Sequence, residues 1–227
     1  MLKKLIAALF TIAVIQTCFA QMEKPDFVKI EKAINDKNSP FFYTTLLKRY
    51  TDNDTTLTNE EYRYLYYGFS FRDTYSPYGK PSVNEELRKA IDDDKTDKII
   101  ELEKKALTEF PFNLGDLFAL ARALEKNGAP AGARLYDKKL VGVAKAILST
   151  GSGDSDSTAM YVISVDHEYD LISLLGYRFG NSQALVQTKE GPTDKMKLEK
   201  NDDNLQYLYF NVERLFASMD KLFKKKG

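Results

Sequence analysis

The spacing of apolar residues changes near residue 150, and this change constrains the fold more than any other feature of the chain. Before it, apolar side chains recur three and four residues apart, which is the period of an amphipathic helix. From Met160 onward, short runs of branched and alternating residues are separated by turn residues, as in strands. The chain is therefore predicted to have a helical region, residues 21–148, and an α+β region, residues 149–227, packed together as one unit.

The helical region is expected to form about six or seven helices packed as hairpins. Thr58 and Glu61 have the spacing of a capping box, in which each side chain accepts a backbone N–H at the start of a helix, and Ser82 and Glu85 repeat that spacing. Residues 110–136 resemble a tetratricopeptide helix pair. An array needs several such pairs about 34 residues apart. No second copy is recognisable, so a long solenoid is not expected.

The α+β region is expected to be a small antiparallel β-meander closed by a C-terminal helix that begins near Val212. Residues 168–175 favour a short helix, because Tyr169, Ile172 and Leu175 share one helical face. Gly191-Pro192 is a turn signal between two strands. The predicted strands are Met160–Val165, Ala184–Thr188, Met196–Glu199 and Leu205–Asn211. The fold class is therefore α+β.

Residues 1–20 have the features of a secretory signal peptide. Lys3 and Lys4 precede an apolar run of about 11 residues, and Cys18-Phe19-Ala20 fits a small-x-small cleavage site. The run is too short to cross a bilayer, which takes about 20 apolar residues. A periplasmic or secreted protein is therefore expected. A lipoprotein anchored at Cys18 is the less favoured alternative, because Thr17 is larger than the residue that usually precedes a lipid-modified cysteine.

Charge and cysteine content exclude several classes of function. The chain has 33 Lys and Arg side chains and 33 Asp and Glu side chains, so it lacks the basic excess that nucleic-acid binding requires. Cleavage of the signal would remove the one cysteine, which leaves no thiol for catalysis or metal binding. No later stretch is apolar enough to span a membrane. No metal and no cofactor are expected.

His167 is the one histidine of the chain, and it is flanked by Asp166, Glu168 and Asp170. A zinc-protease helix needs a second histidine four residues after the first, where this chain has Leu171. The serines before it lack the glycine spacing of a nucleophile elbow. A single histidine beside acids is more often structural than catalytic, although it titrates near neutral pH. Catalysis is therefore the less favoured interpretation.

The polar loop Gly151–Ser157 fits neither of two common ligand-binding motifs. A phosphate-binding loop needs a lysine and a hydroxyl after its second glycine, and Asp154 and Asp156 would repel phosphate. An EF-hand that begins at Asp154 would need glycine at its sixth position and glutamate at its twelfth, where the chain has Ala159 and Val165. The loop is therefore interpreted as a polar connection.

Tyrosines gather between residues 62 and 78. One interpretation is a recognition surface, because aromatic rings with a polar tip are enriched at binding sites. The favoured interpretation is a helix packed between neighbours, because a helix that is apolar on all sides is usually interior. The loop that follows is the more exposed part of this segment, so Tyr75 and Tyr78 are the better candidates for contact with a partner.

Several segments together resemble a family of exported bacterial proteins that is known as domain of unknown function 4919. The tyrosine-rich segment also resembles that family, so most of the chain is covered. The resemblance implies an envelope or secreted location, and it transfers no activity. The segments that carry it are Gly153-Asp154, residues 159–163, 167–170 and 174–176, Asp194-Lys195-Met196 and residues 209–212.

The leading hypothesis is a non-catalytic exported protein that binds a protein, peptide or glycan partner at the seam between the two regions. One alternative is a hydrolase that uses carboxylates with His167, which would need a deep pocket that holds His167 and two acids. Another is a purely structural envelope protein, which predicts a large apolar patch and no cleft. The candidate binding residues are Tyr75, Tyr78, Asp154, Asp156, His167 and Glu168.

Overall fold

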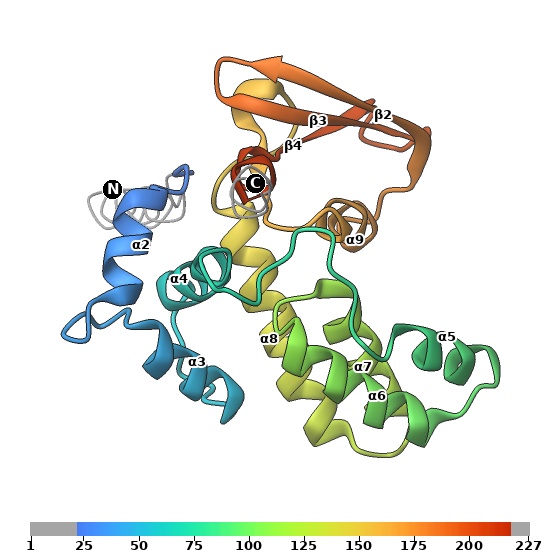
Figure 1. Ribbon diagram of the computed structural model, residues 1–227. Helices are drawn as coiled ribbons and strands as arrows, with labels where there is room; N and C mark the ends of the chain where they lie inside the picture. The colour runs from blue at the N-terminus through green and yellow to red at the C-terminus, as the bar shows by residue number, and fades with distance from the viewer. Residues whose placement is uncertain (1–21, 219–227) are drawn as a thin grey trace, which may run out of the picture.

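The computed structural model describes residues 22–218 and shows an α+β protein in which helices lie below a four-stranded sheet (Figure 1). The predicted signal peptide and Cys18 lie outside the described residues. Among the residues described, no helix is both long enough and apolar enough to cross a membrane.

Helices occupy most of the chain before residue 150, as the periodicity predicts. Asp26 caps the first described helix by accepting the Lys29 N–H at 2.9 Å. Thr58 and Glu61 form the predicted capping box. The helices are α2 (Phe27–Asn35), α3 (Tyr43–Thr51), α4 (Asn59–Phe69), α5 (Asn84–Asp92), α6 (Thr96–Glu109), α7 (Leu114–Lys126) and α8 (Pro130–Leu148).

The second predicted capping box, Ser82 with Glu85, is wrong. The residue that precedes α5 is Val83, and no side chain caps the helix. Ser82 is engaged elsewhere, because its backbone N–H donates to Glu109 at 2.8 Å and its hydroxyl also bonds that carboxylate. The carboxylate of Glu109, at the end of α6, therefore binds the Ser82 groups that would otherwise have capped α5.

Helix α8 runs through the centre of the helical region (Figure 1). It packs against α7 to form the predicted hairpin and against α4 on another side, and its C-terminal end contacts the sheet. Because two neighbours cover it, α8 buries two stripes of side chains. Gly142 lies where α8 meets α4, directly against the ring of Tyr62.

The sheet has the strand order β1-β4-β3-β2. Strands β2, β3 and β4 form the predicted antiparallel meander, with Met196 paired to Leu208. β1 adds a parallel pair to β4, with Met160 opposite Phe210, so the sheet is mixed. Helix α9 (Asp166–Leu174) follows β1, close to the helix predicted there. The strands are β1 (Met160–Tyr161), β2 (Phe179–Thr188), β3 (Gly191–Leu198) and β4 (Tyr207–Asn211).

Two local predictions in the sheet are wrong. The predicted strand Met160–Val165 pairs only at its first two residues, because the Ile163 N–H and carbonyl are bonded by the Tyr66 and Tyr75 hydroxyls of the helical region. Gly191-Pro192 is the start of β3, and the turn is the pair Lys189-Glu190 before it. Gly191 follows this turn with a φ of 107°, which glycine adopts without steric cost.

Tyrosine hydroxyls join the helical region to the segment that follows β1. The Tyr67 hydroxyl donates to the Tyr161 carbonyl at 3.0 Å, and the Tyr75 hydroxyl donates to the Ile163 carbonyl at 2.6 Å. The Ile163 N–H in turn donates to the Tyr66 hydroxyl at 3.2 Å. These bonds satisfy backbone groups that would otherwise be buried without a partner, which is costly.

Arg214 joins the C-terminal helical segment, residues 213–218, to the end of α4. It is buried, and it donates to the Ser70 hydroxyl at 2.8 Å and the Ser70 carbonyl at 2.7 Å. Its guanidinium lies 3.8 Å from the centre of the Phe71 ring. The largest core cluster accordingly contains side chains from α2 at one end of the described chain to Leu215 at the other.

Replacement of Gly142 by alanine is expected to destabilise the protein by about 1–3 kcal/mol, because a methyl group there would overlap the Tyr62 ring. Gly132→Ala is the matched control on the same helix. Its new Cβ would lie 3.5 Å from Leu124, which is ordinary contact, so it should be neutral or stabilise by up to about 1 kcal/mol. Urea unfolding of both variants measures the difference, and equal stabilities would contradict the close packing of α8 on α4.

Candidate functional site: an aromatic cleft with a buried lysine

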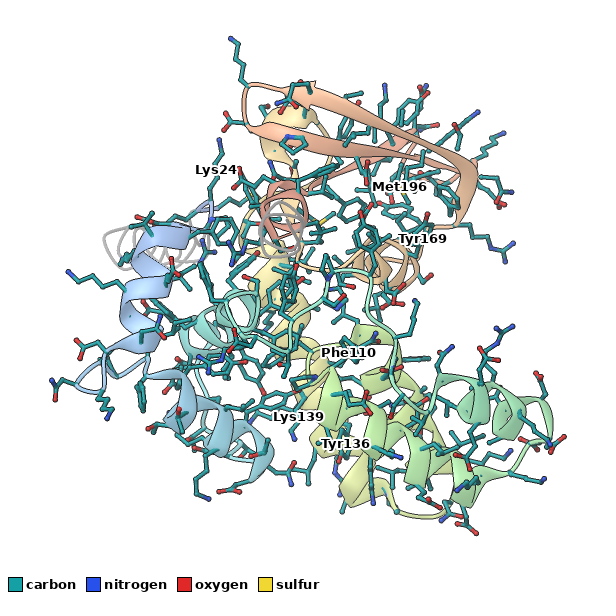
Figure 2. All side chains as sticks on the ribbon, in the orientation of Figure 1. Lys24, Phe110, Tyr136, Lys139, Tyr169 and Met196 are labelled. Carbon is teal, nitrogen blue, oxygen red and sulfur yellow. The ribbon has the colours of Figure 1, made fainter. Side chains whose placement is uncertain are left out.

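A cleft of about 880 Å³ opens between α3 and α4 on one side and α6 to α8 on the other. It lies within the helical region, and not at the seam with the sheet where the sequence placed the site. Phe110, Tyr136 and Lys139 lie close together on its wall (Figure 2). The aromatic lining is Tyr43, Tyr50, Phe69, Phe110 and Tyr136, and the charged lining is Arg72, Asp73, Lys104, Glu109 and Lys139.

Lys139 is buried on the wall of this cleft with only 8% of its surface exposed. Its Nζ lies 4.5 Å from the centre of the Tyr50 ring and 5.2 Å from that of Tyr136. Within residues 22–218, no carboxylate forms an ion pair with it. Burial therefore lowers the pKa of Lys139 to about 8.

The packing of helix α8 explains why Lys139 lies on the wall of the cleft. Lys139, Gly142 and Ala146 are three and four residues apart, so they form one buried stripe, and Gly142 faces α4. Tyr136 precedes Lys139 by three residues on the same helix. The amine is thus brought against the aromatic side chains of α3 by the close packing of α8.

Tyr43 lines the same cleft and is buried there. The residue is 4% exposed, and its hydroxyl has no hydrogen-bond partner within the described part of the chain. The guanidinium of Arg72 lies 5.2 Å from the centre of its ring. The neighbouring Tyr50, by contrast, donates its hydroxyl to the Pro111 carbonyl at 2.7 Å. Buried polar groups are normally bonded, and the Tyr43 hydroxyl is one of the few exceptions among the described residues.

The charges around the cleft favour an anion. Arg72 and Lys104 are exposed and, like Lys139, take part in no ion pair among residues 22–218. Of the two acids on the wall, Glu109 already accepts two hydrogen bonds from Ser82. The cleft can therefore bind an apolar body between aromatic rings and a negative group at the amine.

His167 is buried and is held by Tyr66, whose hydroxyl lies 2.7 Å from His167 Nδ1. That hydroxyl accepts the Ile163 N–H and can therefore donate to the ring nitrogen. Burial lowers the pKa of His167 to about 4 although the nearby charge of Asp166 acts in the opposite direction. The adjoining cavity has a volume of about 20 Å³, and no carboxylate lines it. This is not the deep acidic pocket that the hydrolase hypothesis requires.

Glu168 is fully buried beneath the sheet, and neither oxygen of its carboxyl has a hydrogen bond within 3.5 Å in the described residues. Burial, and next the negative charge of Asp194, raise the pKa of Glu168 to about 9. Asp194 in turn accepts the Gln183 amide at 2.8 Å, and Gln183 accepts the Tyr169 hydroxyl at 2.8 Å. Glu168 is therefore a protonated acid at neutral pH, inside the protein.

The other predicted binding residues are dispersed. Tyr75 is partly buried and uses its hydroxyl to hold Ile163, while Tyr78 is 55% exposed. Asp154 accepts the hydroxyls of Ser152 at 2.9 Å and Thr158 at 2.6 Å, and Asp156 is exposed. The structure brings His167 and Glu168 together on α9 and does not bring the six residues to one site.

An acidic depression lies beside α9. Asp170 accepts the Gly115 N–H at 3.0 Å, and Lys80 bonds Asp166 at 2.6 Å. Burial raises the pKa of Asp116 to about 7 and that of Asp170 to about 6. Among residues 22–218, no set of three acid, histidine or cysteine side chains is arranged to hold a metal ion.

Lys139 and Tyr43 are not predicted from the sequence. The apolar residues at helical spacing in α8 include Tyr136, Leu140 and Val143, and a lysine beside such a stripe is normally solvated. The sequence contains one sign that this face of α8 is buried. Gly142 and Ala146 follow Lys139 at helical spacing, and two small residues on the same face of a helix indicate that another segment packs closely there.

Lys139→Met is expected to stabilise the protein at pH 7 by about 1–3 kcal/mol, because it removes a charge that folding desolvates. The ordinary pKa of 10.5 falls to about 8 on folding, so the unfolded chain binds more protons between these values. Wild-type stability should therefore rise relative to the variant from pH 8 to 10.5. Urea unfolding across this range is the measurement, with the exposed Lys145→Met on the same helix as control. A difference that does not vary with pH would contradict the assignment.

Glu168→Gln should change the pH dependence in the opposite direction. The wild-type folded state keeps the Glu168 proton up to pH about 9, whereas the unfolded chain releases it near 4.5. The free energy of unfolding of the wild type therefore falls as pH rises through this window. Relative to wild type, that of the variant should increase by up to about 1.4 kcal/mol per pH unit. Chemical denaturation from pH 4 to 9 tests this, with the exposed Glu199→Gln as control. Parallel curves for Glu168→Gln and wild type would refute a buried neutral carboxyl.

Comparison with known proteins gives a family and nothing more specific. No curated protein and no solved structure matches the chain. A family model described as Domain of unknown function (DUF4919) matches residues 28–221, which confirms the resemblance inferred from the sequence. The match covers most of the chain, so the protein belongs to the DUF4919 family.

Proposed function

We propose that this chain is an exported, non-catalytic binding protein whose ligand has an apolar body and a carboxylate. The single observation that carries the proposal is Lys139, a residue only 8% exposed whose amine lies beside two tyrosine rings on the wall of a cleft, with no acid of residues 22–218 paired to it. Export rests on the signal-like residues 1–20.

The unpaired amine indicates what the ligand supplies. A buried charge without a counter-ion destabilises the folded protein, and a carboxylate that enters the cleft would relieve that cost. Hydrogen bonds between charged groups contribute about 1.5–3 kcal/mol each. Arg72 and Lys104 on the same wall add favourable charge for an incoming anion.

The size and walls of the cleft indicate the rest of the ligand. Its volume of about 880 Å³ lies within the range of roughly 300–1,000 Å³ typical of small-molecule sites. Aromatic rings from α3, α8 and the segment after α6 offer flat apolar faces on which a ring can stack. A peptide or glycan would meet the same requirements by presenting a carboxylate next to an apolar face.

A binding role fits this geometry better than the two alternatives. A purely structural envelope protein predicts no cleft, and a large one is present. The hydrolase hypothesis needs carboxylates at His167, and the ring is hydrogen-bonded to Tyr66.

The probe for this proposal is 2-naphthoate, with the uncharged and similarly shaped 2-naphthamide as its partner. Fluorescence anisotropy at pH 7 should show that the acid binds at least about tenfold more tightly than the amide, the equivalent of about 1.4 kcal/mol. Lys139→Met should remove this preference, and the exposed Lys145→Met should keep it. Equal binding of acid and amide to the wild-type protein would refute the proposal.

A further inference from the structure

The amine of Lys139 has a second chemical capacity beyond attraction of an anion. It is enclosed by the rings of Tyr50 and Tyr136, it opens to a ligand-sized cleft, and within residues 22–218 no carboxylate or carbonyl oxygen is bonded to it. A lysine in an apolar pocket without an acid partner is the environment in which a side-chain amine becomes a nucleophile.

We propose that Lys139 captures ligands that carry an aldehyde or ketone by forming a reversible imine with them in the aromatic cleft. This inference rests on the proposed function in one respect, namely that the ligand enters the same cleft. It goes further by naming the reacting atom, Lys139 Nζ, and the reacting class of ligand, carbonyl compounds with an apolar body.

The step balances without any oxidant or reductant. The lone pair of the neutral amine attacks the carbonyl carbon, and the carbonyl oxygen takes up a proton, which gives a carbinolamine. The C–O bond then breaks, and the hydroxyl leaves with a proton as water while a C=N bond forms. One amine and one carbonyl thus give one imine and one water, and hydrolysis reverses the step.

Three features of the cleft support this chemistry. First, burial lowers the pKa of Lys139 to about 8, so at pH 7.5 roughly a quarter of the protein carries the neutral amine, against about 0.1% for a lysine of ordinary pKa. Second, the rings of Tyr50 and Tyr136 can stabilise the protonated imine by cation–π attraction. Third, the aromatic side chains that line the cleft can pack against the apolar body of the carbonyl compound.

Burial alone does not produce such a site, as Arg214 shows. Arg214 is 8% exposed, like Lys139, and it also stacks on aromatic rings. Its donors, however, are taken up by the hydroxyl and carbonyl of Ser70. Lys139 contacts aromatic rings as Arg214 does, but its amine has no such hydrogen bonds among the described residues. Lys139 lines the cleft, and Arg214 does not.

The experiment is reductive trapping on the full-length protein. The probe is 6-formyl-2-naphthoate at pH 7.5 with sodium cyanoborohydride, which reduces an imine to a stable secondary amine. Peptide mass spectrometry then measures the rate of labelling at each lysine. Lys139 should be labelled at least about tenfold faster than the exposed Lys145 of the same helix, and its rate should level off above pH about 8. Labelling of Lys139 at the rate of Lys145 or slower overturns the inference.

Two further measurements separate this inference from the proposed function. If 2-naphthoate binds but Lys139 is not labelled preferentially, the imine inference is wrong and the binding role stands. If Lys139 is labelled fast but 2-naphthoate does not bind in preference to its amide, the nucleophile is confirmed and the carboxylate ligand is refuted. Lys139→Arg, which keeps the charge and cannot form the imine, should abolish the fast labelling. Fast labelling that persists in this variant would place the reaction elsewhere and overturn the inference.

Discussion

The structure depends on a small set of hydrogen bonds between tyrosine hydroxyls and the backbone of residues 161–163. Tyr66, Tyr67 and Tyr75 reach from α4 and the loop after it to carbonyl and amide groups that leave the sheet after β1. Buried backbone groups need partners, and here the partners come from side chains 88 to 97 residues away in sequence. The same bonds hold the start of α9, with His167 against Tyr66, so one set of tyrosines ties the helices to the sheet and fills the seam between them.

The packing that fills the seam leaves the open cleft on the other side of α4, among the helices. Close approach of α8 to α4 at Gly142 carries Lys139 inward against Tyr50, where the amine lies beside aromatic rings and is paired with no acid of residues 22–218. Three carboxyl groups of the described residues are also buried with an oxygen that has no hydrogen bond. They are Glu168 under the sheet, Glu103 on α6 and Asp116 on α7, and burial raises their pKa values to about 9, about 8 and about 7. Burial favours the protonated form of a carboxyl group and the neutral form of an amine. None of these three carboxyl groups lines the large cleft, whereas Lys139 does, which is why the proposed chemistry is assigned to Lys139.

Local patterns predicted the parts of the fold that local interactions decide. Thr58 with Glu61 gave a correct helix start because both partners lie within one turn, and the short helix after residue 165 was recognisable from its apolar face. Ser82 with Glu85 has the same spacing, and the prediction failed because Glu109, 27 residues away, bonds Ser82. The strand from Met160 was predicted too long for a similar reason. The candidate site was not predicted, because Gly142 and Ala146 indicate that some segment packs closely on α8 but not which segment it is.

By itself the sequence determined the class of this protein: helices from the 3.6-residue period, a sheet from the alternating runs after residue 160, and membership of a family from residues that match it. These depend on interactions between residues a few positions apart, or on direct similarity. The tertiary structure alone decided that the tyrosines are structural, that His167 is neutral and enclosed, and that Lys139 lies unpaired in a cleft. Each of these depends on which distant segment displaces water from a side chain, and desolvation, not residue type, sets the charge and reactivity of a buried group.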